Sequence, residues 1–491
     1  MTDRRRNSIA AAIAFVAALT VYVSLLPANV SFGDEAEAQT VPYILGIAHP
    51  TGFPAYTLAG WLFSHALPIG SIAWRLNAFA ALCTALSAAA VVLIAGALGS
   101  GVLPALFAGC AFAFGPLVFG GALNANAQIL SGVCGVYALL AAILFVRSGA
   151  PWAFVAACAC CALGIAAHPA SMWILPAIVV ALAWQYRRIT VKLLASGLGA
   201  FVTPLLLYAY FPLRSAYVAA HGLDPNAAAP LFGAGNFDWD TNAPRTTAGF
   251  LNEVLGRHEH AGSAVANTFN LHVLANAATW WFNFSAAQYP IWLFVLAAAG
   301  IAVLGRRDLR SLSVLAAGTL FGIAFAHVYR SDDHIDRYVF VSLAVTAALA
   351  AASARPALPQ MPAHLLRVLV TVVLAVIAGA GLTQTRTALI AHKSIDGQTT
   401  IDAARLETPD NAIIIAEWND AAALGYGAFV EHTLGSRLIV TSWPYDYLDR
   451  FDAWSKTRPV YIARPSIAGL WGASFAPAPL GRRHRAPVLR N

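Results

Sequence analysis

Eleven long apolar runs constrain the fold of this chain more than any other feature of its sequence. They lie at 8–27, 72–98, 102–120, 129–147, 151–167, 172–186, 193–212, 286–304, 311–328, 338–354 and 368–384. A helix needs about 20 apolar residues to cross a bilayer. Only 11% of the 491 residues are charged, whereas a soluble domain carries roughly 25%. The sequence therefore predicts a polytopic α-helical membrane protein with about 11 transmembrane helices, and it excludes an ordinary soluble domain.

The charged residues are unevenly distributed and divide the chain into two parts. They are sparse in residues 1–384, which we expect to form the membrane module, and more frequent in residues 385–491. In the second part, strand-like segments at 412–416, 437–441 and 460–463 alternate with helix-like segments near 397–407, 420–433 and 446–455. This alternation predicts a small C-terminal α/β domain.

The basic residues predict which helix ends face the cytoplasm, because positive charges favour the inner loops of membrane proteins. With the N-terminus inside, Arg147, Arg306 and Arg355 fall in or beside inner loops. The long segments 28–71 and 213–285 then become outer loops that hold most of the acidic residues, and the C-terminal domain also lies outside. We therefore expect a multi-pass protein of the plasma membrane (the inner membrane of a bacterium) with a cytoplasmic N-terminus.

Several classes of function lack support in the sequence. The net charge of +7 fits inner-loop arginines, and the dense basic run at 482–485 lies in a Pro-rich tail, so we expect no nucleic-acid partner. No GxxxxGK[ST], HExxH or GxSxG pattern occurs. P-loop nucleotide hydrolysis, zincin proteolysis and nucleophile-elbow hydrolysis are therefore without a motif.

The segment Ser31–Tyr56 carries the strongest functional signal. Asp34, Glu35 and Glu37 follow the first apolar run directly. If a helix begins at Asp34, Glu37 lies one turn later on the same face, where one carboxylate can act as a general base while the other orients it. The Pro-containing run 49–54 predicts a rigid turn beside them. From the residues alone, the alternative is a solvated acidic loop that flanks a helix end.

The residues of this segment resemble those of a known family. The runs GDEAE, LGIAHPTGFPAY and WRLNAF are similar to the first outer loop of the protein O-mannosyltransferase-like proteins related to human transmembrane protein 260. These proteins are GT-C membrane glycosyltransferases. The residues that match the family's acidic positions, turn and R-x-N motif are Asp34, Glu37, His49, Pro50, Gly52, Pro54, Arg75 and Asn77. Further matches lie at 163–168, 210–214, 238–240 and 413–420.

The chain departs from the family pattern at two places. Ala125-Asn126-Ala127-Gln128 stands where the family usually has an acidic A-E-V-Y stretch, so a polar position is kept and a carboxylate is lost. Glu35-Ala36 replaces the middle of the family's D-S-G-E. Either change is consistent with a different donor sugar or with a member that has lost its activity.

The resemblance implies a reaction and a set of site residues. It implies an inverting glycosyltransferase that moves a mannose-like sugar from a polyprenyl phosphate to an acceptor hydroxyl, expected to be a Ser or Thr of an exported protein. Asp34 is then the candidate catalytic base, and Glu37 has an orienting or acceptor-binding role. The candidate donor- or acceptor-binding residues are Glu35, His49, Arg75, His168, Arg214, Asp240 and Arg337.

The leaving phosphate in such a reaction requires a cation. Arg214 and Arg337 are the candidates, and the alternative for both is an interaction with lipid headgroups. The resemblance implies no metal ion and no cofactor. Two segments nevertheless contain metal-ligand types, His258-Glu259-His260 and Asp332-Asp333-His334-Ile335-Asp336. For the first of them a solvated loop is the alternative, because alternating positions on a helix point apart.

Three other functions stay open at this point. They are transfer of the sugar to a lipid or a cell-envelope polysaccharide, transport of a lipid-linked sugar without bond chemistry, and a scaffold whose C-terminal domain binds partners. A transporter is expected to place ionisable residues at mid-membrane depth. The apolar runs here are nearly free of charge, which favours chemistry at the outer surface. The expected partners are the lipid-linked sugar, its protein or glycan acceptor and the surrounding membrane lipids.

Overall fold

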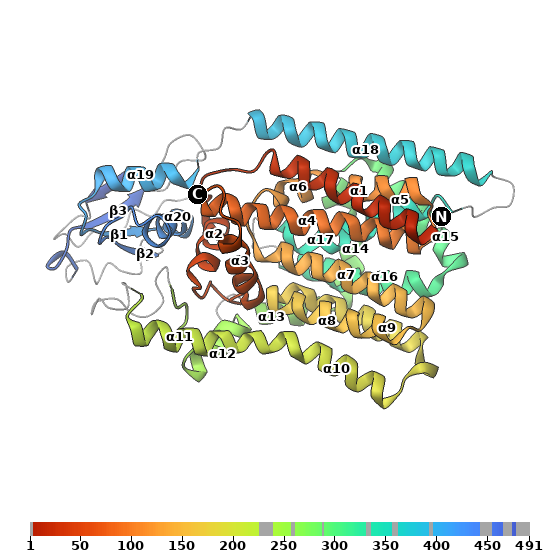
Figure 1. Cartoon of the computed structure of the whole chain (residues 1–491), viewed down its shortest axis with the longest axis horizontal. Coiled ribbons are helices and arrows are strands. Elements are labelled where there is room, and N and C mark those ends of the chain that lie inside the picture. Colours follow the sequence, from red (N-terminus) through yellow and green to blue (C-terminus); the bar gives the residue numbers. More distant parts are fainter. Residues whose placement is uncertain are drawn as a thin grey trace.

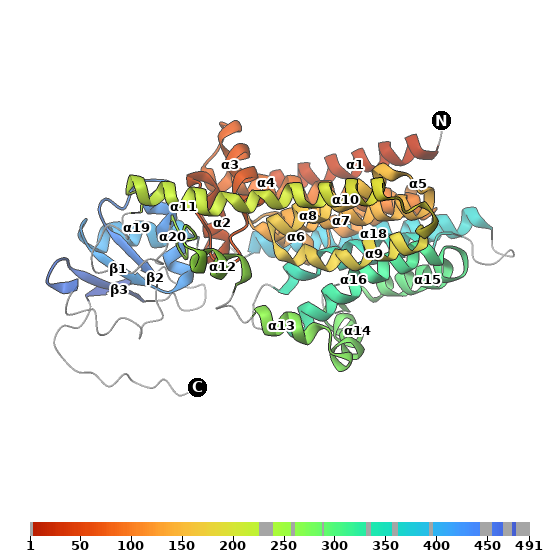
Figure 2. The same cartoon turned by 90° about the horizontal axis from the view of Figure 1, so that it is seen from below.

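The computed structural model of this protein is an elongated helical bundle with a small sheet-containing domain at one end (Figure 1). It describes residues 3–224, 239–256, 261–286, 289–329, 335–355, 362–391, 396–441, 454–464 and 474–477. The N-terminus lies at the end of the bundle opposite the sheet, and a view turned by 90° shows the same arrangement (Figure 2).

Each of the eleven apolar runs contains a helix. In chain order the bundle consists of α1 (Asp3–Val23), α4 (Ile72–Ala97), α5 (Val102–Ala113), α6 (Pro116–Ala122), α7 (Ala127–Ser148), α8 (Pro151–Ala167), η1 (Pro169–Ile174), α9 (Leu175–Trp184), η2 (Tyr186–Arg188), α10 (Val191–Leu205), η3 (Leu206–Ala209), α11 (Tyr210–His221), α15 (Ile291–Arg307), α16 (Leu309–Val328), η4 (Ile335–Val339), α17 (Phe340–Ala352) and α18 (Ala363–Ala391). The expected polytopic helical class is confirmed.

The number of membrane crossings stays a prediction. Among the described residues, six helices are long and apolar enough to cross a membrane, or seven if the bent pair α5–α6 is one span. The two helices of that pair meet at 64°, where Pro116 begins α6 and cannot donate the hydrogen bond that would continue α5. Three further apolar helices are shorter, at Pro151–Ala167, Pro169–Trp184 and Arg337–Ala352.

Small residues bring the central helices close together. Helices α4, α7 and α17 are buried along most of their length and are rich in alanine. A side chain at Gly300 would overlap the Leu349 carbonyl, so α15 and α17 touch through their backbones. Helices α10 and α18 instead expose apolar side chains along their length, as expected at the lipid-facing rim.

The connections at the N-terminal end of the bundle carry the basic residues. Arg147, at the end of α7, pairs with Asp308 between α15 and α16. Arg355 follows α17 and donates to the Leu98 carbonyl at 3.3 Å. This clustering agrees with the pattern of inner-loop arginines in the sequence, and the side of the membrane on which it lies stays a prediction.

The opposite end of the bundle is built from shorter helices and the C-terminal domain. The short helices near this domain are α2 (Gly33–Ile44), α3 (Pro54–Ala66) and α12 (Thr247–Leu255), whereas α13 (Ala261–Thr268) and α14 (Leu271–Ala286) lie along the bundle beside α16 (Figure 2). The domain contains α19 (Gly397–Glu407), β1 (Ile413–Ala416), α20 (Trp418–Phe429), β2 (Leu438–Thr441), β3 (Val460–Arg464) and β4 (Ser474–Pro477). The strands lie in the order β2-β1-β3-β4, and only β4 is antiparallel to its neighbour.

The expected small C-terminal sheet is therefore confirmed, with α19 and α20 close to the segments predicted near 397–407 and 420–433. Most of the helix expected near 446–455 lies outside the described residues. Hydrogen bonds hold this domain against the first loop and the start of α4. The Gly397 amide donates to the Val30 carbonyl at 2.8 Å, and the Ala73 amide donates to the Tyr426 hydroxyl at 3.0 Å.

Candidate functional site

Helix α2 presents the three acidic residues at its N-terminus. It begins at Gly33, with Asp34 and Glu35 in its first turn and Glu37 one turn later. Carboxylates are favourable there because the helix dipole is positive at this end. The helix expected to begin at Asp34 is thus present, one residue longer.

Glu37 binds the Pro-containing turn rather than the open space of the site. Only 5% of Glu37 is exposed. Its Oε1 accepts a hydrogen bond from the His49 amide at 2.8 Å, and its Oε2 lies 2.5 Å from His49 Nδ1. The His49 ring meets the rings of Phe53 and Trp418 edge-on, at 5.3 and 5.6 Å. Both carboxylate oxygens of Glu37 therefore orient the turn.

Asp34 is bound from two distant parts of the chain. The Trp418 indole N–H donates to Asp34 Oδ1 at 2.8 Å. Arg337 Nη1 lies 3.4 Å from Asp34 Oδ2, and Nη2 of the same arginine pairs with Glu35. The Arg337 side chain is only 4% exposed, whereas 28% of the Asp34 side chain is exposed. A buried cation thus lies beside a carboxylate that solvent can reach.

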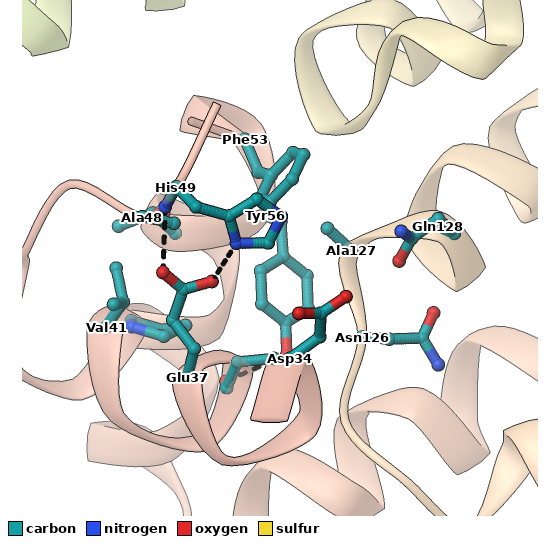
Figure 3. A pocket seen from close by; sticks show the side chains of 13 residues that line it. Asp34, Glu37, Val41, Ala48, His49, Phe53, Tyr56, Asn126, Ala127 and Gln128 are labelled. Carbon is teal, nitrogen blue, oxygen red and sulfur yellow. Dashed lines mark hydrogen bonds and ion pairs between the residues drawn. The ribbon is translucent and has the colours of Figure 1, made fainter. Parts of the chain in front are cut away.

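A pocket of about 340 Å³, counting its open mouth, lies in front of Asp34. Its walls are Asp34, Glu37, Ala38, Val41, Pro42, Ala48, His49, Phe53, Tyr56, Thr57, Asn126, Ala127 and Gln128. Figure 3 shows the Asp34 carboxylate and the bonded Glu37–His49 pair on one side, with Asn126, Ala127 and Gln128 facing them. The stretch in which the chain departs from the family pattern therefore forms the wall opposite Asp34.

Three of the pocket-lining residues show why this part of the chain is rigid. Pro42 lies inside α2 and has no N–H with which to bond the Ala38 carbonyl. The Tyr56 hydroxyl donates to that carbonyl instead, at 3.0 Å. Across the pocket, Asn126 caps α7, and its Oδ1 accepts from the Ile129 amide at 2.9 Å. Both walls are therefore held by hydrogen bonds.

His168 lies behind the turn, between α8 and η1. Burial, with smaller contributions from His49 and Arg337, lowers its pKa to about 3, so the imidazole is neutral at pH 7. Its Nδ1 accepts from the Ala170 amide at 3.1 Å, and its ring stacks on Phe53 at 5.3 Å. A neutral ring in this position packs the turn and supplies no positive charge for a phosphate.

Arg214 binds the C-terminal end of α2 and does not line the pocket. Its guanidinium donates to the carbonyls of Leu45 at 2.6 Å and Ile44 at 3.0 Å, which are the carbonyls left open where α2 ends. It also lies over the Trp239 ring, at 5.9 Å. Of the two arginines proposed for the phosphate, the structure brings Arg337 to Asp34 and leaves Arg214 at the far end of α2.

Asp240 and Arg75 are likewise bound elsewhere. Asp240 is buried, accepts from Ser215 at 3.0 Å and pairs with Arg245 at 2.5 Å, and burial raises its pKa. Arg75 donates to the carbonyls of Ser64, Ile69 and Gly70 at 2.9–3.2 Å, so it closes the loop between α3 and α4. Both residues hold loops that surround the site.

Two residues near the site carry no clear signal in the sequence. Trp418 stands alone before a polar pair, and its contact with Asp34 spans 384 positions. Glu253 is fully buried in α12, where its Oε2 accepts from Asn242 at 2.8 Å and its Oε1 packs on Gly52. Burial raises the pKa of Glu253 to about 8. The sequence offered one sign of the burial of Glu253, namely that its carboxylate stands in the mostly apolar stretch FLNEVL.

The expectation that the protein binds no metal ion stays a prediction. Residues 258–260 and 332–334 lie outside the described part of the chain. Within the described part, no group of three or more His, Cys, Asp or Glu side chains is placed to hold a metal ion.

Comparison with known proteins supports the resemblance over the N-terminal part. Residues 34–191 match the family model described as the protein O-mannosyl-transferase TMEM260 N-terminal domain. The chain is 34% identical over 104 residues to protein O-mannosyl-transferase TMEM260 of Mus musculus, which covers 20% of this chain and 14% of the mouse protein. It is 35% identical over 65 residues to the Dictyostelium discoideum protein of that name, covering 13% and 8%. The matches thus span less than a sixth of these relatives.

Solved structures share the fold over nearly the whole chain. ArnT from Cupriavidus metallidurans, bound to undecaprenyl phosphate, has a TM-score of 0.56 at 14% identity, covering 92% of this chain and 93% of ArnT. The oligosaccharyltransferase of Archaeoglobus fulgidus in its apo form has a TM-score of 0.52 at 14% identity, covering 89% and 65%. These similarities confirm the expected GT-C fold.

Proposed function

We propose that this protein is a GT-C glycosyltransferase that moves a sugar from a polyprenyl-phosphate carrier to an acceptor hydroxyl with inversion at the anomeric carbon. The family match covers α2, the turn and the facing wall, which together build the pocket. The fold is shared with a protein whose structure contains undecaprenyl phosphate. By analogy with the family, the sugar is mannose-like and the acceptor is a Ser or Thr of an exported protein at the outer membrane face.

The observation that carries this proposal is the contact between Asp34, which lines the pocket, and the buried Arg337 behind it, 3.4 Å apart. Glycosyl transfer from a lipid phosphate needs a base for the acceptor proton and a cation for the leaving phosphate. Asp34 reaches solvent, and Arg337 is a buried cation beside it. The two requirements therefore meet in one place.

The proposed reaction has two bond changes and one proton transfer. The acceptor oxygen attacks the anomeric carbon, and its proton passes to the Asp34 carboxylate. The bond between that carbon and the phosphate oxygen breaks, and the phosphate leaves with the electron pair. Arg337 then exchanges a carboxylate partner for a phosphate oxygen, while Glu35 keeps the guanidinium in place.

Glu37 has a different role in this mechanism. Both of its oxygens are engaged by His49, so it holds the turn that forms one side of the acceptor site. His49 and its neighbours Phe53 and Tyr56 line the same wall, and aromatic rings of this kind offer apolar faces to a sugar or a peptide.

The test is the release of free polyprenyl phosphate by purified protein from a panel of polyprenyl-phosphate sugars, with a Ser/Thr peptide, a polysaccharide or a lipid as acceptor. Asp34→Asn keeps the size of the side chain and the acceptor for Trp418, and it removes the base together with the negative charge beside Arg337. Release should fall by about 10²- to 10⁴-fold. The matched control is Asp402→Asn, an exposed carboxylate on α19, which should leave the rate unchanged.

Each outcome of this test is informative. Full activity of Asp34→Asn contradicts the assignment of the base. Absence of release by the wild-type protein with every donor contradicts glycosyl transfer, and movement of the intact donor across liposomes would then show a transporter. The acceptor that supports release separates protein glycosylation from transfer to a lipid or a polysaccharide.

A further inference from the structure

A tryptophan side chain links the C-terminal domain to the proposed base. Trp418 is the first residue of α20, and its indole N–H donates to Asp34 Oδ1 at 2.8 Å. An indole N–H is a donor only, and a carboxylate oxygen is its natural acceptor. A residue from the end of the chain therefore determines how the carboxylate at the beginning of α2 is turned.

The packing around Gly33 permits this contact. Gly33 has a φ of +52°, and a Cβ at this position would lie 2.5 Å from Asn419 Oδ1. The positive φ favours glycine at this position, and the Asn419 side chain fills the space that a Cβ would occupy, so the start of α20 lies close to the start of α2. The position of α20 is further held by Tyr426, whose hydroxyl accepts from the Ala73 amide at 3.0 Å.

The Trp418 ring also contacts the residue that binds Glu37, the second acidic group of the site. It meets the His49 ring edge-on, at 5.6 Å and 83°, and His49 is the partner of Glu37. The indole thus lies against the turn while its N–H holds Asp34. This arrangement takes up Asp34 Oδ1 and leaves Oδ2 on the side of Arg337, 3.4 Å away.

We propose that Trp418 is a positioning residue for the Asp34 base, so that the C-terminal domain completes the active site instead of serving as a separate binding module. The inference rests on the proposed function. A hydrogen bond from a fixed donor favours one orientation of the carboxylate and its ionised form. Without that donor, fewer molecules present an ionised oxygen to the acceptor hydroxyl, and the loss is greatest at low pH.

The test variant is Trp418→Phe, which keeps a ring against His49 and removes the N–H. We expect kcat to fall by roughly 10- to 100-fold, which is the rate change that corresponds to the loss of one hydrogen bond to a charged group. The donor KM should change by less than about twofold, because Arg337 is untouched, and the acid limb of the pH–rate profile should move to higher pH. The matched control is Trp454→Phe, a buried tryptophan of the same domain, which should leave the pH profile in place.

A second measurement separates failure of this inference from failure of the proposed function. Unfolding in mixed detergent micelles is measured for wild type, Trp418→Phe, Asp34→Ala and the double variant, and needs no substrate; Asp34→Ala is used here because it removes the acceptor of the indole N–H. We expect the two substitutions to be coupled by about tenfold in the unfolding equilibrium. Absence of coupling overturns the inference even if no donor is ever found. With an active wild type, an unchanged kcat and pH profile in Trp418→Phe also overturns it.

Discussion

The pairing of Glu37 with His49 leads to a quantitative prediction about the role of the second carboxylate. Glu37→Gln keeps the volume of the side chain and an acceptor for the His49 amide. It removes the charge and places an amide NH₂ where Oε2 now lies 2.5 Å from His49 Nδ1. The variant therefore tests the side-chain contact while it leaves the backbone contact intact.

The expected magnitude follows from the burial of this contact. A hydrogen bond to a charged group contributes about 1.5–3 kcal/mol to stability, and Glu37 is only 5% exposed, so solvent screens the contact little. We expect Glu37→Gln to lower the free energy of unfolding by about 2 kcal/mol. His49→Ala removes the same contact from the other side. The double variant should then lose about 2 kcal/mol less than the sum of the two single variants.

The assay is a double-mutant cycle on purified protein, unfolded by titration of denaturing detergent into mild micelles. A suitable control is the exposed Asp402–Arg405 pair on α19, whose coupling should stay below about 0.5 kcal/mol. A coupling near zero between Glu37 and His49 would refute the conclusion that Glu37 stabilises the turn through His49. So would a loss of kcat in Glu37→Gln as large as that in Asp34→Asn, because it would make Glu37 the better candidate for the base.

Two further predictions concern the second loop. Arg214→Lys loses one of two carbonyl contacts and the stacking on Trp239, so thermal unfolding should show a loss of about 1–2 kcal/mol with little change in donor KM; a selective rise in donor KM at unchanged stability would contradict this. For Glu253, burial raises the pKa from 4.5 to about 8, so the folded state keeps a proton that the unfolded state releases. The contribution of this carboxyl to the free energy of unfolding is fully present below pH 4.5, and several kcal/mol of it are lost progressively as the pH rises from 4.5 to about 8. Glu253→Gln should abolish this loss in unfolding measured against pH, and an identical pH dependence in the two proteins would show that the carboxyl is not buried as described.

Much of the fold could be predicted because its signals are local. An apolar run long enough to span a bilayer predicts a helix from composition alone, and each of the eleven runs contains one. The acidic start of α2 and the Pro-containing turn at 49–54 could also be predicted from the sequence, because helix periodicity and proline geometry depend only on neighbouring residues. The alternation of helix and strand patterns predicted the C-terminal sheet in the same way.

The site itself depended on contacts between distant residues. Arg214 and Arg337 looked equivalent in the sequence, each near a predicted outer helix end, yet one binds the end of α2 and the other the proposed base 303 positions away. Glu37 looked like a free partner of Asp34, and the structure shows both its oxygens bound to His49.

The sequence by itself thus determined a membrane-embedded helical bundle, a small C-terminal sheet and an acidic helix beside a stiff turn, because each follows from interactions among near neighbours in the chain. Only the tertiary structure decided which cation meets Asp34 and that Trp418 touches it. Those choices arise when helices pack side by side, and a one-dimensional pattern contains no measure of which buried donor will reach which carboxylate.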